Sequence, residues 1–238
     1  MAKNKETDFN WCKDLISNCK SEIAKRVVGQ DEVIDGILTA MVAGGHVLLE
    51  GVPGLAKTLA CKTVSDISGL DFKRIQFTPD LLPADLTGTL IFEQATGDFK
   101  VRRGPVFTNI VLADEINRAP AKVQSALLEA MAENQVTIGE TTYELPKPFF
   151  VLATQNPIEQ EGTYNLPEAE LDRFLMKVMV NYPSAKSEVE IVKNKGKGTE
   201  IKVEKVLSEK DLKKCRELLD EVVCDDAIIE YIAFTFAH

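Results

Sequence analysis

Hydrophobic positions along the chain switch between the spacing of strands and the spacing of helices. Three runs, 47–49, 110–113 and 149–153, are continuously apolar, as expected of strands that are buried on both faces. Apolar residues between 123 and 131 fall at i, i+3, i+4, i+7 and i+8, which is one face of an amphipathic helix. Strands that alternate with helices in this way predict an α/β fold with a parallel sheet covered on both faces.

The same patterns predict further elements over most of the chain. We expect two hairpins, at 89–101 and at 135–145, with turns at Thr96-Gly97-Asp98 and Gly139-Glu140. Residues 193–205 are rich in lysine and glycine and are expected to form a loop. The other expected elements are helices at 9–26, 31–43, 57–67, 209–222 and 226–236 and strands at 72–77 and 177–180.

Composition and charge narrow the class of protein. At 238 residues the chain fits one large domain, or one domain with a small appendage, and 45% hydrophobic residues suffice for a substantial core. The formal net charge of −9 argues against non-specific nucleic-acid binding, which needs a basic surface, although it leaves room for a local basic patch. No apolar stretch reaches the ~20 residues that span a bilayer, and residues 1–6 do not begin a signal peptide. We therefore expect a cytoplasmic protein without a membrane partner.

Cysteine and histidine usage excludes two kinds of site. The five cysteines are odd in number, and no two have the sequence spacing of a metal or redox motif, so free buried or half-buried thiols are expected. His46 and His238 are the only histidines, which is too few for a histidine-based zinc site or a Ser-His-Asp triad. The chemistry must therefore come from other residues.

A glycine-rich segment follows the first apolar run directly and reads Gly51-Val52-Pro53-Gly54-Leu55-Ala56-Lys57-Thr58. Between a strand and a helix such a segment is a phosphate-binding loop, because its glycines let backbone N–H groups close on phosphate oxygens without obstruction from Cβ. Lys57 is expected to reach the β and γ phosphates, and Thr58 to give its hydroxyl to Mg²⁺. The helix that begins near Lys57 adds its positive dipole end. The usual pattern has glycine in place of Ala56, whose methyl group is tolerable where the backbone is already helical.

Acidic and amide residues end the next two apolar runs. Asp114 and Glu115 close the run 110–113; an Asp there can hold Mg²⁺ through water, and a Glu can polarise the water that attacks the γ-phosphate. Asn156 follows the run 149–153 and is expected beside Asp114, where its amide could orient that water or touch the γ-phosphate. Alone, the acidic pair could be a solvated loop and Asn156 a turn residue before proline. The phosphate-binding loop upstream favours the catalytic interpretation of all three.

Two arginines are candidates for a role in phosphoryl transfer. Arg173 lies in Leu171-Asp172-Arg173-Phe174, just before the last expected strand. An arginine supplies fixed positive charge in the transition state, often from a neighbouring subunit, and we prefer this role for Arg173 over a surface salt bridge. For Arg118, a place at a subunit interface and an ordinary surface role stay equally open.

Together these motifs resemble those of the MoxR family of AAA+ ATPases, from about residue 20 to the end of the chain. Alanine at position 56 is also usual in that family. The matching segments are Val28-Gly29-Gln30, the loop 51–58, Leu-Ala-Asp-Glu-Ile-Asn-Arg-Ala-Pro at 112–120, Ala-Thr-Gln-Asn-Pro at 153–157 and Leu-Pro-Glu-Ala-Glu-Leu-Asp-Arg-Phe at 166–174.

The resemblance implies a role for each of these residues. ATP or ADP would be held by Val28 and Gly29 at the adenine, by Gly51, Val52, Pro53, Gly54, Leu55, Ala56, Lys57 and Thr58 of Walker A, and by Leu59 directly after it. Mg²⁺ would be held by Thr58 and by Asp114 of Walker B. Glu115 would be the Walker B base, Asn156 sensor 1, and Arg173 the arginine finger.

The resemblance also implies the architecture. We expect a P-loop NTPase of three αβα layers, with the phosphate-loop strand central and with the two hairpins as inserts that face a central pore or a partner. Residues 1–183 would form this core and 184–238 the beginning of a small α-helical lid. The family carries a further arginine, sensor 2, in that lid. No matching Ser-Pro-Arg stretch is present, so we expect the lid to be cut before it, which puts full turnover in doubt.

The implied function is Mg²⁺-dependent binding and hydrolysis of ATP by a homo-oligomeric ring, expected to be a hexamer. Such a ring would act as a chaperone-like remodeller that aids protein maturation or metal-cofactor insertion, with a von Willebrand factor A-domain partner. Three alternatives stay open: a motor on DNA, a magnesium-chelatase-like subunit, and a nucleotide-gated scaffold with little turnover. The DNA motor is disfavoured because the hairpin 135–145 carries Glu140 and Glu144 but no lysine or arginine.

Overall fold

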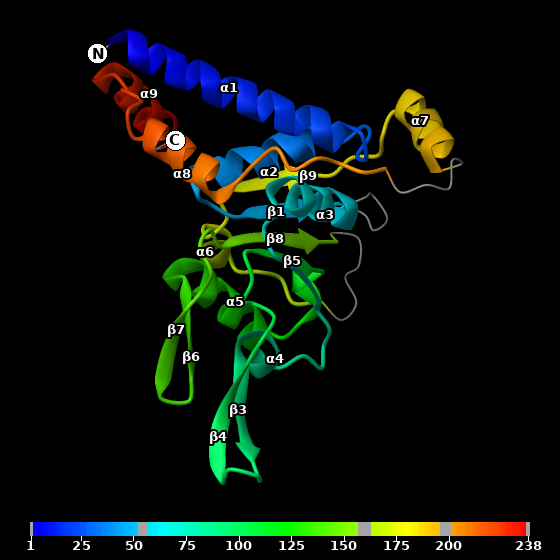
Figure 1. The fold of residues 1–238 in the computed structure, drawn as a ribbon, viewed down its shortest axis with the longest axis vertical. Helices are drawn as coiled ribbons and strands as arrows, with labels where there is room; N and C mark the ends of the chain where they lie inside the picture. The colour runs from blue at the N-terminus through cyan, green and yellow to red at the C-terminus, as the bar shows by residue number, and fades with distance from the viewer. Residues whose placement is uncertain (1, 52–56, 157–162, 196–200, 237–238) are drawn as a thin grey trace.

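A computed structural model describes residues 2–51, 57–156, 163–195 and 201–236 of the chain. Its centre is a five-stranded parallel sheet in the order β2-β5-β8-β1-β9 (Figure 1). The strands are β1 Val47–Glu50, β2 Phe72–Gln76, β5 Ile110–Asp114, β8 Phe150–Gln155 and β9 Met176–Met179. The three apolar runs of the sequence are therefore β1, β5 and β8, adjacent strands in the interior of the sheet.

Helices cover the sheet on both faces, as Figure 1 shows. Alternate strand residues explain why: Val47 and Leu49 pack into one buried cluster, whereas Leu48 packs into the other. The first cluster joins the sheet to α1 Ala2–Ala24, α2 Asp31–Ala43, α3 Lys57–Ser68 and α8 Glu209–Leu219. The second joins it to the short α4 Pro83–Thr87 and to α5 Ala121–Glu133. The expected three-layer α/β fold is confirmed.

Two hairpins extend from the α5 side of the molecule (Figure 1). They are β3 Gly88–Glu93 with β4 Asp98–Arg103, and β6 Gln135–Ile138 with β7 Thr141–Glu144. Phe92 and Phe99 of the first hairpin pack edge to face, with ring centroids 5.4 Å apart, yet both are mostly exposed. The remaining elements are the 3₁₀ helix η1 Ile116–Arg118 and the helices α6 Glu168–Leu171, α7 Ala185–Lys195 and α9 Asp226–Phe236.

The chain after α7 returns to the core. The backbone N–H groups of Val206 and Leu207 donate to the carbonyl of Ile67 at the end of α3, at 2.9 and 3.0 Å. Leu207 and Leu212 belong to the same buried cluster as α1, α2 and α3. The start of α8 is thus fixed against the helical layer that contains α3.

Most predicted elements are confirmed, and α2 has the predicted bounds because Gly44 ends it with a left-handed φ of 78°. Three expectations are wrong. The phosphate-loop strand β1 is interior but fourth in order, and β8 is the middle strand. Residues 193–195 belong to α7, which had no recognisable pattern because its Val189 and Val192 stay exposed. Cys224 is exposed rather than buried or half-buried, since it lies between α8 and α9.

The cysteines in the structure are free thiols, as expected. Within the residues that the structure describes, no helix combines the length and the apolar character that crossing a bilayer requires.

Candidate functional site

The parallel sheet brings the predicted site residues to one edge, where the strands end. Gly51 follows β1, Asp114 ends β5, and Asn156 follows β8. Because β8 lies between β5 and β1, all three residues meet at the carboxyl edge of neighbouring strands. Ligands of open α/β sheets bind at this edge.

Gly51 and Lys57 fix the two ends of the phosphate-binding loop, whose residues 52–56 lie outside the described residues. A Cβ on Gly51 would stand 2.5 Å from the carbonyl oxygen of Val180, so only glycine fits there. The Lys57 ammonium donates to the Gly51 carbonyl at 2.5 Å. Burial lowers the pKa of Lys57, whereas the Asp114 and Glu115 carboxylates act in the opposite direction. The Lys57 ammonium therefore lies close enough to Asp114 and Glu115 for both carboxylates to act on its charge.

Asp114 is held by two different strands. The Thr154 hydroxyl on β8 donates to Asp114 Oδ1 at 2.6 Å. Arg74 on β2 donates to Asp114 Oδ2 through Nη2 at 2.6 Å and Nε at 3.1 Å. The carboxylate is therefore kept in one orientation by partners on both sides of its own strand.

Glu115 stands just beyond β5 in the left-handed region, with φ 57° and ψ 51°, which is uncommon for a residue with a side chain. Its backbone N–H donates to the Thr154 hydroxyl at 2.8 Å. Gln76 Nε2 and Arg118 Nη1 both donate to its Oε2, at 2.7 and 3.1 Å. The backbone strain and the three hydrogen bonds together turn the carboxylate to the same edge as Asp114.

The remaining predicted residues of this edge occupy different depths. Asn156 is buried, and its backbone carbonyl accepts a hydrogen bond from Asn117 Nδ2 at 3.4 Å. Thr58 is half-buried in the first turn of α3, and Leu59 beside it is exposed. The start of α3 thus presents both residues next to the loop end at Lys57.

The segment Val28-Gly29-Gln30 reaches the same edge from the layer of α2. Gln30 Nε2 donates to the carbonyl of Asn181 just after β9, at 3.1 Å. A Cβ on Gly29 would stand 2.7 Å from the Cβ of Ser187, so the segment also touches the start of α7. Val28 and Gly29 therefore lie near the end of β9, the strand that pairs with β1. This position is consistent with a place beside the phosphate-binding loop.

Arg173 lies elsewhere. It precedes β9, and the nearby Leu175 N–H donates to the carbonyl of His46 just before β1, at 2.9 Å. Arg173 is therefore at the amino edge of the sheet, separated from Gly51 by the length of β1, which at ~3.3 Å per residue is roughly 13 Å. The structure does not bring Arg173 to the site of its own chain.

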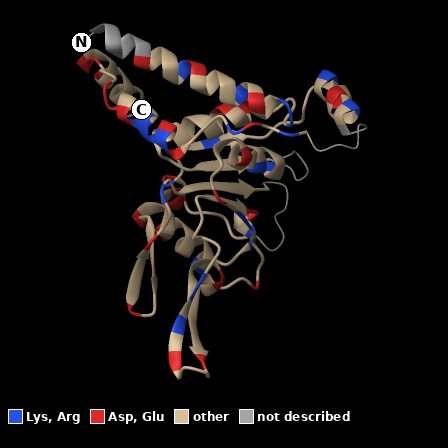
Figure 2. Ribbon diagram, viewed as in Figure 1, with Lys and Arg blue, Asp and Glu red and all other residues tan. Residues whose placement is uncertain are grey.

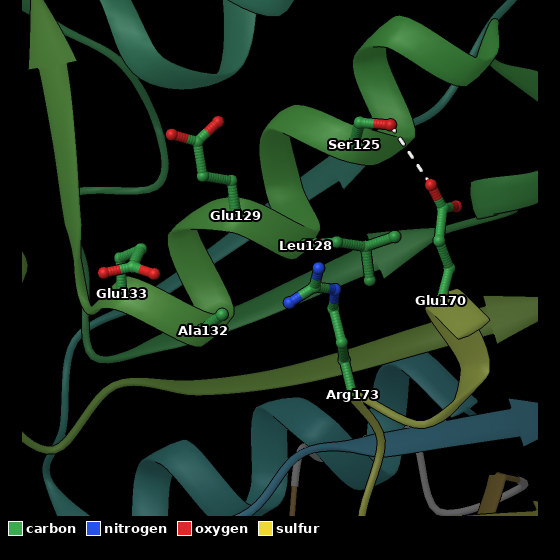
Figure 3. Close-up of a pocket in the computed structure, with 7 residues that line it drawn as sticks. All are labelled: Ser125, Leu128, Glu129, Ala132, Glu133, Glu170 and Arg173. Carbon is green, nitrogen blue, oxygen red and sulfur yellow. Dashed lines mark hydrogen bonds between the residues drawn. The ribbon is translucent and has the colours of Figure 1, made fainter.

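Arg173 instead faces α5 across a pocket of about 270 Å³ (Figure 3). Ser125 and Glu170 close one side of this pocket through a 3.2 Å hydrogen bond. Arg173 is exposed and forms no ion pair with any described residue. The lining residues are Ser125, Leu128, Glu129, Ala132, Glu133, Glu170 and Arg173.

The sequence analysis missed three residues that organise the acidic pair: Arg74, Gln76 and Thr154. Arg74 and Gln76 alternate on β2, so both point to the same face, and Arg74 Nη2 also donates to Gln76 Oε1 at 2.9 Å. A signal for them was available, since polar residues in a strand next to the one bearing Asp114 must face something polar. Thr154 carried no such signal, because a single threonine directly after the apolar run 149–153 does not show which strand its hydroxyl contacts.

Comparisons with known proteins agree with this geometry. A family model described as "ATPase family associated with various cellular activities (AAA)" matches residues 46–176. The chain is 50% identical to Chaperone MoxR1 of Mycobacterium tuberculosis over 211 residues, which are 89% of this chain and 56% of that protein. It is 37% identical to Protein MoxR of Methylorubrum extorquens over 180 residues, 73% of this chain and 51% of that one.

A solved structure is also similar. A crystal structure from Cytophaga hutchinsonii, described as a candidate ATPase, superposes with a TM-score of 0.87 at 50% identity, covering 98% of this chain and 71% of that one. The chain spans about half the length of the two MoxR relatives named above. The matched family model, the similarity to MoxR proteins and the fold agree: the chain belongs to the MoxR family of AAA+ ATPases.

Proposed function

We propose that this chain binds ATP with Mg²⁺ and hydrolyses the bond between the β and γ phosphates. The observation that carries the proposal is the shared carboxyl edge at which Lys57, Asp114 and Glu115 meet, with each carboxylate held by several hydrogen bonds. A lysine among carboxylates at the end of a phosphate loop fits a polyphosphate, whose negative charge would replace the Gly51 carbonyl as the partner of the ammonium.

The donor set at this edge fits a magnesium ion. The Thr58 hydroxyl and the Asp114 carboxylate are hard oxygen ligands, and Mg²⁺ bound with a nucleotide takes few protein ligands besides phosphate and water. When bound, the ion would neutralise charge on the phosphate oxygens. Asp114 Oδ1 and Oδ2 already accept hydrogen bonds, so Thr154 and Arg74 would orient the carboxylate rather than coordinate anything themselves.

Glu115 is the proposed general base. Its carboxylate would accept a proton from the attacking water, and Gln76 and Arg118 would hold it in the required direction. Asn156 would orient the same water from the end of β8. Lys57 and the loop N–H groups would hold the phosphates still during the reaction.

Arg173 is proposed to act on the nucleotide of a neighbouring copy. Its exposed guanidinium lies at the edge opposite to its own site, which supports a role between chains rather than within one. This arrangement supports a homo-oligomeric ring, because a head-to-tail contact that closes would give every copy a site and an arginine. The number of six comes from the family resemblance alone.

The cellular role is proposed by analogy. One relative is named a chaperone, which supports a remodelling function in protein maturation or metal insertion. The von Willebrand factor A-domain partner and the cytoplasmic location stay predictions from the sequence. The DNA motor remains disfavoured: Figure 2 shows lysine and arginine along β4, but acidic residues stand at the end of that hairpin, where Lys100 pairs with Glu93, and at the tip of β6–β7.

Binding of ATP to purified protein, measured by calorimetry with Mg²⁺ present, tests the proposal. Lys57→Ala should abolish binding, whereas Lys62→Ala, the same charge change on the exposed side of α3, should preserve it. Unchanged affinity in Lys57→Ala would contradict the phosphate-loop assignment. Binding without turnover in the unmodified protein would favour the nucleotide-gated scaffold, and stimulation by a porphyrin-binding partner would favour the magnesium-chelatase-like subunit.

A further inference from the structure

Two thiols that are far apart in the sequence meet between α1 and α8. Cys12 Sγ and Cys215 Sγ are 3.1 Å apart, although the residues are separated by 203 positions. A disulfide bond is about 2.05 Å long, so a closure of about 1 Å joins the two sulfurs. Figure 1 shows α1 and α8 running along the same side of the helical layer, away from the hairpins.

Neighbouring contacts hold the two helices in this register. Lys214 Nζ forms an ion pair with Asp8 at 2.8 Å and stands 4.3 Å from the centroid of the Trp11 ring. Asp8 is one helical turn before Cys12, and Lys214 directly precedes Cys215, so the same side chains that pair the helices align the thiols. The contact between the sulfurs is therefore part of a packed interface and not an isolated approach.

The helix α8 is also held against α2 and the hydrophobic core. Arg216 Nη2 donates to the carbonyl of Met41 at the end of α2, at 2.9 Å. Leu212, on the buried side of α8, belongs to the main hydrophobic cluster. Cys215 thus has little freedom to move away from Cys12 while the protein is folded.

The two thiols differ in their access to solvent. Cys12 is half-buried, whereas Cys215 is 1% exposed. Burial, followed by the neighbouring Cys12 thiol, raises the pKa of Cys215 to about 12, so at neutral pH it carries its proton. Cys12 is therefore the thiol that a reagent in solution meets first, and Cys215 is the one placed to react second.

We propose that Cys12 and Cys215 form a reversible disulfide, a modification site of the protein whose oxidant is a small-molecule disulfide such as oxidised glutathione. The Cys12 thiolate attacks one sulfur of the oxidant, a mixed disulfide forms, and the first reduced thiol leaves. Cys215 then loses its proton and attacks Cys12 Sγ, which releases the second reduced thiol. Two electrons pass from the cysteine pair to the oxidant, and the two cysteine protons are balanced by those on the two released thiols.

The bond would connect the first helix of the chain to the helix that follows the core. The segment leading into α8 hydrogen-bonds to the end of α3 at Ile67, and α3 begins at Lys57 of the phosphate-binding loop. The oxidised protein therefore holds α8 covalently to α1, on the layer of helices that carries this loop. Such a cross-link across a long stretch of chain stabilises the folded state by restricting the unfolded one.

The test is incubation of the native protein with defined ratios of oxidised to reduced glutathione, followed by alkylation and peptide mass spectrometry. A peptide pair linked through Cys12 and Cys215 is expected, is removed by dithiothreitol, and is absent in Cys12→Ser. Cys224→Ser is the matched control and should keep the link, because Cys224 is exposed and lies away from the pair. Oxidised wild type should also melt on the order of 5–10 °C above reduced wild type, with no such difference in Cys12→Ser.

The exposed Cys224 also shows whether the oxidant has reacted. If glutathione is found on Cys224 while Cys12 and Cys215 are alkylated separately, the proposal is wrong. It is equally wrong if Cys12 is linked to Cys19 or Cys224 in preference to Cys215. Folding of the serine variant is checked by comparing its melting temperature with that of reduced wild type.

Discussion

The two edges of the central sheet differ in what they hold. At the carboxyl edge, Lys57, Asp114 and Glu115 are charged, partly buried and joined to neighbouring strands by hydrogen bonds. At the amino edge, the buried group is the neutral ring of His46, which packs against Phe149 and Phe150 at centroid distances of 6.0 and 6.4 Å. The carboxyl edge thus holds charged groups in its interior, whereas the buried part of the amino edge is neutral.

The difference supports the proposal that the active site is completed by a second copy of the chain. The amino edge needs apolar packing to hold the starts of the strands, so its arginine, Arg173, is turned outward into the pocket against α5. Positive charge for a reaction at the carboxyl edge of the same chain cannot come from there. In the proposed ring it would come from a second copy, and the two edges would then be complementary surfaces.

Loss of Arg173 should give the largest change in turnover. Arg173→Ala is expected to lower kcat about 10³- to 10⁵-fold while ATP affinity stays near that of wild type, because the side chain stabilises the transition state from outside the binding site. Steady-state hydrolysis at rising protein concentration measures this effect. Turnover per chain in wild type should climb with concentration, since assembly creates the shared site.

A mixing experiment sharpens the same prediction. Arg173→Ala and Glu115→Gln chains, each inactive alone, should regain activity when combined. At some interfaces the intact Glu115 of one chain then meets the intact Arg173 of the other. Lys57→Ala mixed with Glu115→Gln should stay inactive, since both changes damage the same edge. Equal behaviour of the two mixtures would show that Arg173 does not act between chains.

Glu115→Gln should give the next largest effect. The amide keeps the shape and can still accept from Gln76 and Arg118, but it cannot take a proton, so kcat is expected to fall 10²- to 10⁴-fold. ATP should remain bound, which equilibrium binding of a labelled nucleotide would report. Glu230→Gln, the same change on the exposed α9, is the control. Wild-type turnover in Glu115→Gln would show that another residue is the general base.

Most of the carboxyl edge could be predicted from the sequence, because its functional residues lie in contiguous sequence motifs. Apolar runs locate β1, β5 and β8, and the residues directly after them fall at one edge by the geometry of parallel strands. The strand order needed the structure, since local periodicity does not say which strands pair. Thr154 was missed for the same reason, because its two partners, Asp114 and Glu115, lie at the end of the neighbouring strand β5 and directly after it.

Pairings between distant segments were beyond the sequence for a different reason. The contact of Cys12 with Cys215 depends on how α8 docks on α1, which is set by packing and not by the spacing of either cysteine. The direction of Arg173 likewise depends on the fold of 163–175 around the amino edge. Sequence reasoning proposed Arg173 as the arginine finger but could not say where its side chain points.

Thr154→Val should have a moderate effect on the carboxyl edge. The change keeps the shape but removes the hydroxyl that donates to Asp114 and accepts from the Glu115 N–H, leaving two groups without this partner at about 1–3 kcal/mol each. We expect kcat to fall roughly 10- to 100-fold with a smaller change in affinity. Thr154→Ser restores the hydroxyl and should recover most of the rate. A rate in Thr154→Val equal to wild type would show that this bridge does not position the acidic pair.

His46 should give the smallest effect, and only on stability. Val151 N–H donates to its Nδ1 at 3.1 Å, so the ring is neutral, and its protonated Nε2 donates to the Met131 carbonyl, with 3.4 Å between nitrogen and oxygen. Burial, with a smaller contribution from Arg216, lowers the pKa of His46 below its usual value of about 6.5. As pH falls through about 6.5, His46 binds a proton in the unfolded chain but stays neutral in the folded protein. The free energy of unfolding therefore decreases below that pH. Denaturant unfolding at pH 7.5 and 5.5 should show the decrease, at most about 1.4 kcal/mol per pH unit for one proton, and a smaller decrease in His46→Gln. An unchanged pH dependence in His46→Gln would mean that the amino edge tolerates charge after all, and the contrast between the two edges would then rest on Arg173 alone.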